Sequence, residues 1–315
     1  TPTKTVAQTF ALLFTVSIML IFAINAHDIF TSFVKTTKLG NNYEEALRLD
    51  YFTNDDIPDD YETFTRLTAN NKQINGTNDT FNFNLYGIES DSTLKVLLDN
   101  DVTQNLLLED GIIISEYLRY NYDLKVGDTM SFSVKGTLYT YEIVGINNEL
   151  IENNAFILKE ELNNAYLLDD TYYNGIYTTD STYQSDNILI RISYHEALDE
   201  IQNTLRTSIN IVYFILSLSA FIGLFMFGFV ITNYLSDNRK NIAILKSIGY
   251  NSKEINKKYI LVIIITFVIA FIIAIPTTDL LFDLLLKNII NQLGYILILD
   301  ITLVNIVISF LSFSF

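Results

Sequence analysis

The chain has 315 residues, half of them hydrophobic, and a formal net charge of −16. Residues 26–207 hold 31 of the 36 acidic residues but only 12 of the 20 basic ones, so the acidity belongs to one part of the chain. That part offers no basic patch to phosphates, and we therefore expect no nucleic-acid partner. The sequence contains no cysteine, which excludes disulfide frameworks and thiolate metal sites.

The first apolar run, residues 6–26, is interrupted only by uncharged polar residues. A signal peptide has an apolar stretch of about 7–15 residues, and this run is longer. We therefore predict that residues 1–26 form a retained transmembrane helix, with a cleaved signal as the alternative. Since the sequence begins at Thr1 rather than at a methionine, we expect a fragment or a processed chain.

Residues 27–207 form a different kind of region, in which short apolar stretches alternate with Asn, Asp, Thr, Tyr and Gly. Period-two alternation or β-rich composition predicts strands at residues 80–86, 111–114, 129–134, 139–146 and 187–192. Helices are expected at residues 115–122 and 196–205, and a hairpin connection at Gly136-Thr137. A region of this length can bury its own core, so we predict an α+β domain.

Two further runs, residues 209–231 and 260–276, carry no charge. A helix of about 20 apolar residues crosses a bilayer core of ~30 Å, so both runs are predicted to be spans. The loop between them, residues 233–258, carries six basic residues against two acidic ones. Short basic loops stay in the cytoplasm, which places this loop inside and residues 27–207 outside.

The resulting fold class is a multi-pass membrane protein with an α-helical transmembrane domain and a large α+β extracytoplasmic domain inserted between spans 1 and 2. The four predicted spans are residues 1–26, 208–232, 259–276 and 299–315. Residues 301–315 give only 15 apolar-rich positions, short of the ~17 needed, so we expect the last span to be truncated.

Residues 277–298 form the predicted outer segment. Asp279, Asp283, Lys287 and Asn291 recur every four residues and would lie on one side of a helix. This polar stripe favours a helix that lies at the outer interface or packs on neighbouring spans, with a re-entrant segment as the alternative.

The basic loop itself contains a short predicted helix. Ser236 or Asp237 can cap its start, Gly249 can end it, and Lys246 near its end suits the helix dipole. Asn251 would begin a second helix, with Glu254 three residues later in a capping-box relation.

Ile242, Leu245 and Ile248 form an apolar stripe on this short helix. Such a stripe is expected to be buried against lipid headgroups or in a groove of a partner protein. The residues alone leave both possibilities open, together with the simpler interpretation of a positively charged turn.

The loop string NRKNIAILKSIGYNSKEI closely resembles the cytoplasmic loop of FtsX-like permeases, the membrane subunits of MacB-type ABC transporters. The matching positions are Arg239, Ile242, Ala243, Ile244, Leu245, Lys246, Ser247, Ile248 and Gly249. Asn241 stands where that family usually has Glu, which puts one polar contact in doubt.

The acidic domain also resembles the extracytoplasmic core domain of this family. The similarity lies in a helix start at Ser115-Glu116, a turn at Val126-Gly127-Asp128, and a strand pair that ends at Val144-Gly145-Ile146. The domains implied are therefore a MacB-like core domain at residues 27–207 and an FtsX-like permease domain at residues 208–315.

The resemblance implies a membrane subunit of the bacterial plasma membrane that binds no cofactor itself. It implies a cytoplasmic ABC ATPase that binds the ATP, a second permease copy or paralogous half, and membrane lipid as partners. It also implies that a coupling helix docks on the ATPase through residues drawn from this set: Arg239, Ile242, Leu245, Lys246, Ile248 and Gly249.

Other function classes receive less support. The sequence has no HExxH, CxxC, GxxxxGK[ST] or GxSxG motif, so we expect no enzyme activity of its own. The acidic run from Asp55 to Glu62 lacks the ligand order of a calcium loop. The main alternative is a membrane sensor with an extracellular ligand-binding domain that signals through an associated protein, although the chain returns to the membrane after a short loop.

Overall fold

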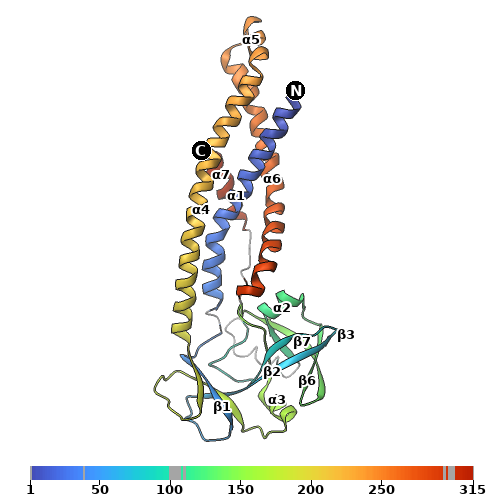
Figure 1. Cartoon of the computed structure of the whole chain (residues 1–315), viewed down its shortest axis with the longest axis vertical. Coiled ribbons are helices and arrows are strands. Elements are labelled where there is room, and N and C mark those ends of the chain that lie inside the picture. Colours follow the sequence, from blue (N-terminus) through green and yellow to red (C-terminus); the bar gives the residue numbers. More distant parts are fainter. Residues whose placement is uncertain are drawn as a thin grey trace. The chain divides into compact units, whose positions relative to one another are not determined.

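The structure is a computed structural model that describes residues 2–37, 40–98, 108, 111–293, 296 and 302–314. It divides into two compact units (Figure 1). A helical unit comprises residues 1–31, 205–288 and 298–315, and a β-rich unit comprises residues 32–204 and 289–297.

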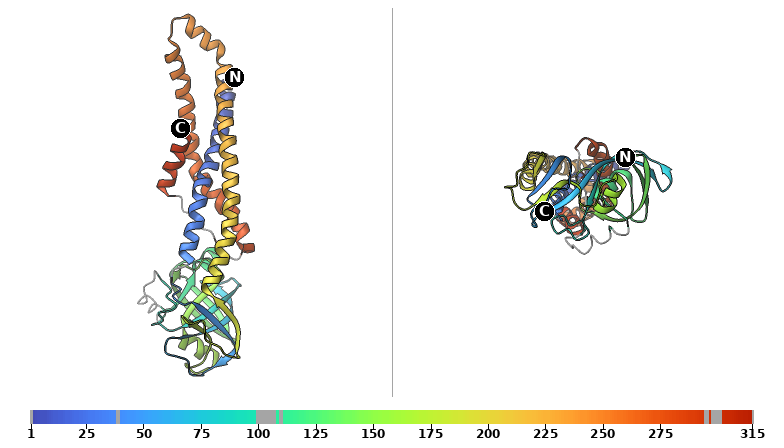
Figure 2. Two further views of the ribbon diagram at one scale, coloured as in Figure 1. Left: turned by 90° about the vertical axis from the view of Figure 1, so that its left-hand side faces the viewer. Right: turned by 90° about the horizontal axis from the view of Figure 1, so that it is seen from below.

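The helical unit is built from long helices. Their bounds, some of which extend into the other unit, are α1 (Pro2–Thr37), α4 (Tyr194–Asp237), α5 (Arg239–Ser247), α6 (Ser252–Leu293) and α7 (Leu303–Ser314). The left view in Figure 2 shows α4, α5 and α6 as a helical hairpin with the short α5 at its bend. The predicted boundary after residue 26 lies inside α1, which continues to Thr37.

One helical segment of the described residues, Ser252–Leu281 in α6, is long and apolar enough to cross a membrane. A shorter apolar stretch, Ala7–Phe22, lies in α1. Four spans remain a prediction, whereas the helical character of the apolar runs at residues 209–231 and 260–276 is confirmed.

Small residues allow α1, α6 and α7 to pack closely. Thr266, Ala270, Ala274 and Thr278 recur every four residues along α6 and are all buried. Ala270 and Ala274 belong to one apolar cluster with Leu13 and Ile21 of α1, and Phe310 of α7 packs against it. Short side chains let helix backbones approach where no water drives association, so this stripe sets the packing of the three helices.

A buried polar contact joins α1 to α7. The Asn305 amide Nδ2 donates to Asn25 Oδ1 at 3.0 Å and to Asp28 Oδ2 at 2.6 Å. Asn25 in turn donates to the carbonyl of Ile21 at 2.7 Å. Because a buried amide without partners costs about 1–3 kcal/mol, this set of contacts fixes the register of the two helices.

The helix that contains the third predicted span does not end at Pro276, because α6 continues through this proline to Leu293. Proline removes one backbone hydrogen bond, and the two following threonines add side-chain bonds at the same place. Thr277 and Thr278 donate their hydroxyls to the carbonyls of Ile273 and Ala274 at 2.7 and 2.8 Å. Apolar helices tolerate proline when neighbouring hydroxyls stabilise the backbone in this way.

The predicted outer segment therefore begins as a continuation of α6 rather than as a separate helix. Of the polar stripe predicted there, only Asp279 has a described side chain, and it is exposed. The other three side chains lie outside the described ones.

The β-rich unit contains ten strands and two short helices. The strands are β1 (Glu45–Thr53), β2 (Glu62–Ile74), β3 (Thr77–Asn78), β4 (Asn82–Ile88), β5 (Ile112–Ser115), β6 (Thr129–Val134), β7 (Thr137–Asn147), β8 (Asn154–Leu158), β9 (Tyr173–Thr178) and β10 (Ile188–Ser193). The helices are α2 (Glu116–Tyr122) and α3 (Lys159–Tyr166).

Six strands form a closed sheet in the order β2-β4-β8-β5-β7-β6, because β6 also pairs with β2. The strand β2 is long enough to take three partners in succession along its length. Residues 62–64 pair with β9, residues 65–70 with β4, and residues 70–74 with β6. Strands β9, β1 and β10 thus extend the sheet away from the closed part, with β10 at its edge.

Side-chain alternation divides the core into clusters on the two faces of the strands. In β5, Ile112 and Ile114 join the cluster formed with Phe83, Met130 and other residues, whereas Ile113 joins the cluster around Phe64 on the opposite face. Successive side chains of a strand point to opposite faces, so both faces of β5 are buried. This explains the uninterrupted apolar run that marked this strand in the sequence.

All five predicted strands and the predicted helix at residues 115–122 are confirmed, with bounds shifted by a few residues, and the helix predicted at residues 196–205 is the first part of α4. The hairpin between β6 and β7 turns at Lys135 and Gly136, both with positive φ, one residue earlier than predicted. A second hairpin, β2–β3, turns at Asn75 and Gly76 in the same conformation. Asn-Gly is a strong hairpin signal that the sequence analysis overlooked.

Gly175 of β9 offers a test of this packing. A Cβ atom there would lie 2.1 Å from the buried ring of Phe64, so Gly175→Ala is expected to destabilise the β-rich unit by about 1–3 kcal/mol. Gly145→Ala is the comparison variant, because its Cβ would meet the Ile113 and Leu98 side chains at 3.3 Å, a tight contact that a small shift of these side chains relieves. Circular dichroism during urea unfolding measures both; equal stability of the two variants would contradict the packing described.

Candidate functional site

The predicted coupling helix is α5, and its start differs from the prediction. The preceding helix α4 runs to Asp237, so Ser236 and Asp237 are helical and cannot act as caps. Asn238 occupies the cap position without a side-chain capping bond, and its amide donates instead to the carbonyl of Tyr234 at 2.8 Å. The turn between α4 and α5 is therefore a single residue, which the cap preferences of Ser and Asp did not reveal.

The end of α5 follows the prediction. Gly249 has a φ of 99°, a conformation that only glycine adopts readily. Its N–H donates to the carbonyl of Lys246, and the N–H of Tyr250 donates to the carbonyl of Leu245, both at 3.1 Å. These two bonds form a Schellman motif, which ends the helix and satisfies its last carbonyls.

The start of α6 has the predicted capping box. Asn251 Oδ1 accepts from the N–H of Lys253 at 3.3 Å, and Glu254 Oε2 accepts from the N–H of Asn251 at 3.3 Å. Close by, the rings of Tyr234 and Tyr259 meet edge to face at 5.9 Å, linking α4 to α6. The short helix is therefore held at both ends by defined contacts.

No side chain of α5 is buried. Ile242 and Leu245 are half-buried, Ile244 is 56% exposed and Ile248 is 70% exposed. An apolar surface held rigidly in water is costly, at roughly 25 cal/mol for each Å² left uncovered. Covering this apolar stripe with a partner surface would therefore be favourable.

Basic side chains surround this stripe. Arg239 and Lys240 lie in the first turn, which contains no acidic residue, and Lys246 lies in the last turn. Cations in a first turn oppose the helix dipole, so an acidic or anionic surface nearby would stabilise the helix.

Residues 213–314 match the family model described as FtsX-like permease C-terminal. About a third of the chain is thus similar to the C-terminal part of FtsX-like permeases. This agrees with the resemblance predicted from the loop string, and all six predicted coupling residues lie within the matched segment.

Among solved structures, the chain is similar to the extracellular domain of the noncanonic ABC-type transporter YknZ from Gram-positive bacteria. The two share 16% identity with a TM-score of 0.29, over 48% of this chain and 73% of that chain. No curated protein matches the chain.

The three motifs noted in the acidic region have clear structural roles. Ser115 caps α2, with its hydroxyl accepting from the N–H of Leu118 at 3.1 Å. Gly127 has a φ of 93° in the turn before β6, and Asp128 accepts from the N–H of Lys125 at 2.8 Å. Gly145 lies on β7 with Ile113 packed close to its Cα. These residues build the fold rather than a reaction centre.

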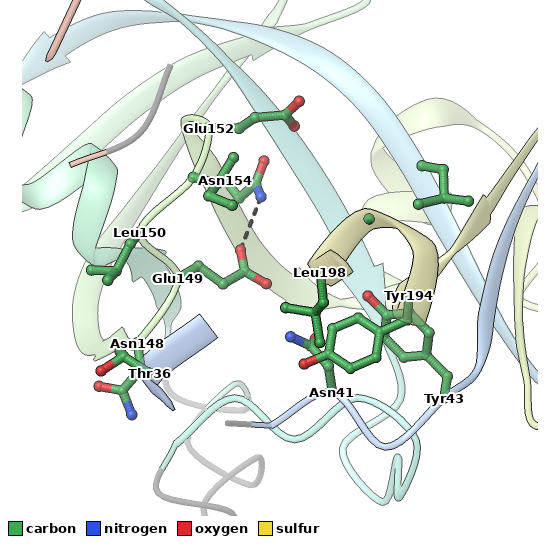
Figure 3. Close-up of a pocket in the computed structure, with 13 residues that line it drawn as sticks. Thr36, Asn41, Tyr43, Asn148, Glu149, Leu150, Glu152, Asn154, Tyr194 and Leu198 are labelled. Atoms are coloured by element: carbon green, nitrogen blue, oxygen red, sulfur yellow. Dashed lines mark hydrogen bonds between the residues drawn. The ribbon is translucent and has the colours of Figure 1, made fainter. Parts of the chain in front are cut away.

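The sequence analysis did not predict a cavity in the β-rich unit. About 230 Å³ in volume, it is lined by Thr36 at the end of α1, by Tyr194 and Leu198 at the start of α4, and by the segment from Asn148 to Glu152. Figure 3 shows Glu149, Asn154 and Glu152 on one side and Tyr194, Leu198 and Asn41 on the other. The lining residues are scattered over the sequence, so no local pattern could have identified them.

Tyrosines line this cavity and lie next to it. Tyr43 lines it, and burial followed by the nearby Glu149 carboxylate raises the pKa of this phenol. The ring of Tyr43 stacks on Tyr177 at 4.6 Å. Burial also raises the pKa of Tyr86 to about 12. These phenols are therefore neutral at physiological pH, and their hydroxyl groups can donate hydrogen bonds.

Within the described residues, no group of His, Asp and Glu side chains could hold a metal ion. The acidic run from Asp55 to Glu62 instead lines an open hollow. The Glu62 carboxylate in this run accepts hydrogen bonds from the N–H groups of Thr93 and Leu94 at 2.8 and 3.1 Å.

The Schellman motif gives a direct test of the geometry of α5. Gly249→Ala forces a side chain into a left-handed conformation, at a cost of about 1–2 kcal/mol. The amides of residues 245–250 are then expected to exchange roughly 5–30 times faster. Hydrogen exchange with mass spectrometry measures this, and Ser247→Ala, on the same helix, is the control that should leave the rates unchanged.

Proposed function

We propose that this protein is the membrane permease subunit of an ABC transporter, driven by a separate cytoplasmic ATPase. The observation that carries this proposal is α5, a rigidly ended helix with an uncovered apolar stripe, located inside the segment that matches FtsX-like permeases. ATP binding and hydrolysis take place on the partner, and this chain contributes no catalytic group.

The apolar and basic groups of α5 define the partner surface. Ile242, Leu245 and Ile248 enter a hydrophobic groove of the ATPase, as amphipathic helices do in other helix-in-groove complexes. Arg239 and Lys246 face acidic side chains at the rim of that groove, where complementary charge gives orientation and speed of association. Gly249 holds the helix end and makes no contact of its own.

Force is transmitted outward through α4. This helix is unbroken over 44 residues, from Tyr194, directly after β10, to Asp237, one residue before α5. A displacement of α5 by the ATPase therefore reaches the β-rich unit through one continuous helix. The work done there is export, extraction or release of a peptide, lipoprotein or similar substrate.

The membrane arrangement belongs to the same proposal. The chain lies in the bacterial plasma membrane with four spans, residues 27–207 outside and residues 233–258 in the cytoplasm. A second permease copy or a paralogous half completes the dimer, and membrane lipid covers the remaining apolar faces.

The alternative from another class is a membrane sensor that signals through an associated protein. The cavity in the β-rich unit favours it, because a ligand site outside the membrane is what a sensor requires. The two functions differ in their cytoplasmic partner, and identifying that partner distinguishes them.

Leu245→Asp tests the docking assignment. It places a charge in the apolar stripe, and association with the ATPase from the same genome is expected to fall at least about tenfold, since burying an unpaired charge costs several kcal/mol. Co-purification of the full-length permease in detergent measures the loss, with membrane insertion unchanged.

Ser247→Asp is the matched control. Ser247 is exposed and lies on the opposite face of α5, so it introduces the same charge two residues away without touching the stripe. Equal capture of the ATPase by Leu245→Asp and wild type would refute docking through α5. Failure of wild type to capture any ATPase would favour the sensor.

A further inference from the structure

Two adjoining cavities in the β-rich unit form one composite site. The outer cavity is the one of about 230 Å³ shown in Figure 3. The inner cavity has about 120 Å³. Tyr43, Glu149, Asn154 and Ile192 line both cavities, which therefore lie side by side.

The inner cavity contains an unusual cation, Arg48 of β1. Its guanidinium makes neither a salt bridge nor a hydrogen bond with any residue that the structure describes. Burial, followed by repulsion from Arg66, lowers the pKa of this group. An arginine in such surroundings offers its fork of N–H donors to an anionic group, for which carboxylate and phosphate are the matching shapes.

The second cation of the inner cavity, Lys95, is already occupied. Its ammonium forms a salt bridge with Glu149 and donates to Asn41 Oδ1 at 2.6 Å. It also lies 5.5 Å from the centre of the Phe156 ring. Arg48 is therefore the cation that remains available in this cavity among the described residues.

The outer cavity has the opposite charge. Glu149 and Glu152 line it, and no basic side chain is among its described lining residues. Lys95 neutralises Glu149. Glu152 is exposed, accepts from the amide of Asn84 at 3.1 Å, and its charge favours the protonated form of Arg48. Glu152 thus supplies negative charge to this side of the site.

Glu152 has a strained backbone conformation. Its φ is 62°, a left-handed conformation that a glutamate rarely adopts. Its carbonyl accepts from Ser115 Oγ and from the N–H of Asn154, both at 3.1 Å. Strained residues held by surrounding contacts occur preferentially at binding sites.

The remaining walls are apolar and aromatic. Leu150, Ile192 and Leu198 line the outer cavity, and the rings of Tyr43 and Tyr194 form one side of it. Sites for drug-sized ligands usually have about 300–1,000 Å³, so the outer cavity takes a smaller molecule.

We propose that this composite site binds a small zwitterion of the size of a free aliphatic amino acid. The ligand's carboxylate contacts Arg48, its ammonium lies toward Glu152, and its aliphatic side chain packs on Ile192 and Leu198. This binding is a property of the β-rich unit and does not depend on the proposed ATPase partner.

The position of the site gives the ligand a means of action. Thr36 lies in the last turn of α1, and Tyr194 and Leu198 lie in the first two turns of α4. A bound molecule contacts both helices at the ends that belong to the β-rich unit. Occupancy therefore stabilises one placement of these two helix ends over others.

Four compounds with the same side chain test the charge requirement on the full-length chain in lipid nanodiscs: leucine, leucinamide, N-acetylleucine and N-acetylleucinamide. Leucine carries both charges, the next two carry one each, and the last carries none. Each lost charge is expected to weaken binding by about tenfold, the effect of one charge-assisted hydrogen bond. Saturation-transfer NMR gives the dissociation constants.

Two variants assign the charges to residues. Arg48→Met keeps the length of the side chain, and should make leucine bind no better than leucinamide. Glu152→Gln keeps the shape, and should make leucine bind no better than N-acetylleucine. Lys125→Gln and Glu160→Gln, both at exposed positions of the same unit, are the charge-matched controls and should retain wild-type binding.

The proposal is overturned by any of three results. These are no binding of leucine up to its solubility limit, equal binding of leucine and N-acetylleucinamide by the wild type, and an unchanged preference for leucine in both site variants. The first two use only the wild-type chain, so a folding defect in a variant cannot hide the answer.

Discussion

Backbone hydrogen bonding in apolar surroundings is the constraint on which the rest of this structure depends. Where water is absent, every N–H and C=O must find a partner inside the chain, and a helix provides one for each. The run at residues 209–231 therefore has to be helical, and α4 extends it in both directions without a break. One stiff element consequently joins β10 to the turn before α5.

The two ends of this element have contrasting chemistry. Near its end, α5 presents an apolar stripe and basic side chains on a helix whose termini are fixed by a Schellman motif and a capping box. At its start, α4 contributes Tyr194 and Leu198 to an acidic cavity, which adjoins a second cavity that Arg48 lines. The first suits a macromolecular partner, which can cover a protruding face, and the second suits a small molecule, which can enter a concave one.

Neighbouring helical segments outweigh local preferences at two places in this chain. A proline in a helix interior costs ~3 kcal/mol, yet α6 continues through Pro276, next to which the hydroxyls of Thr277 and Thr278 bond to backbone carbonyls. Ser236 and Asp237 are predicted as caps, an effect of about 1 kcal/mol, but α4 continues through both. In both places the helix on either side favours continuation.

The sequence by itself determined the features that arise within a few consecutive residues. Charge-free runs predicted the long helices, and alternating residues predicted β4, β6, β7 and β10. Gly249 predicted the end of α5, and Asn251 with Glu254 predicted the start of α6. The loop string was also sufficient to indicate the permease family. Only the tertiary structure decided the closed order of six strands, the contact between Asn25 and Asn305, and the position of the Arg48 cavity beside the one that Glu152 lines. These depend on residues up to 280 positions apart, and packing, rather than any local pattern, brings such residues together.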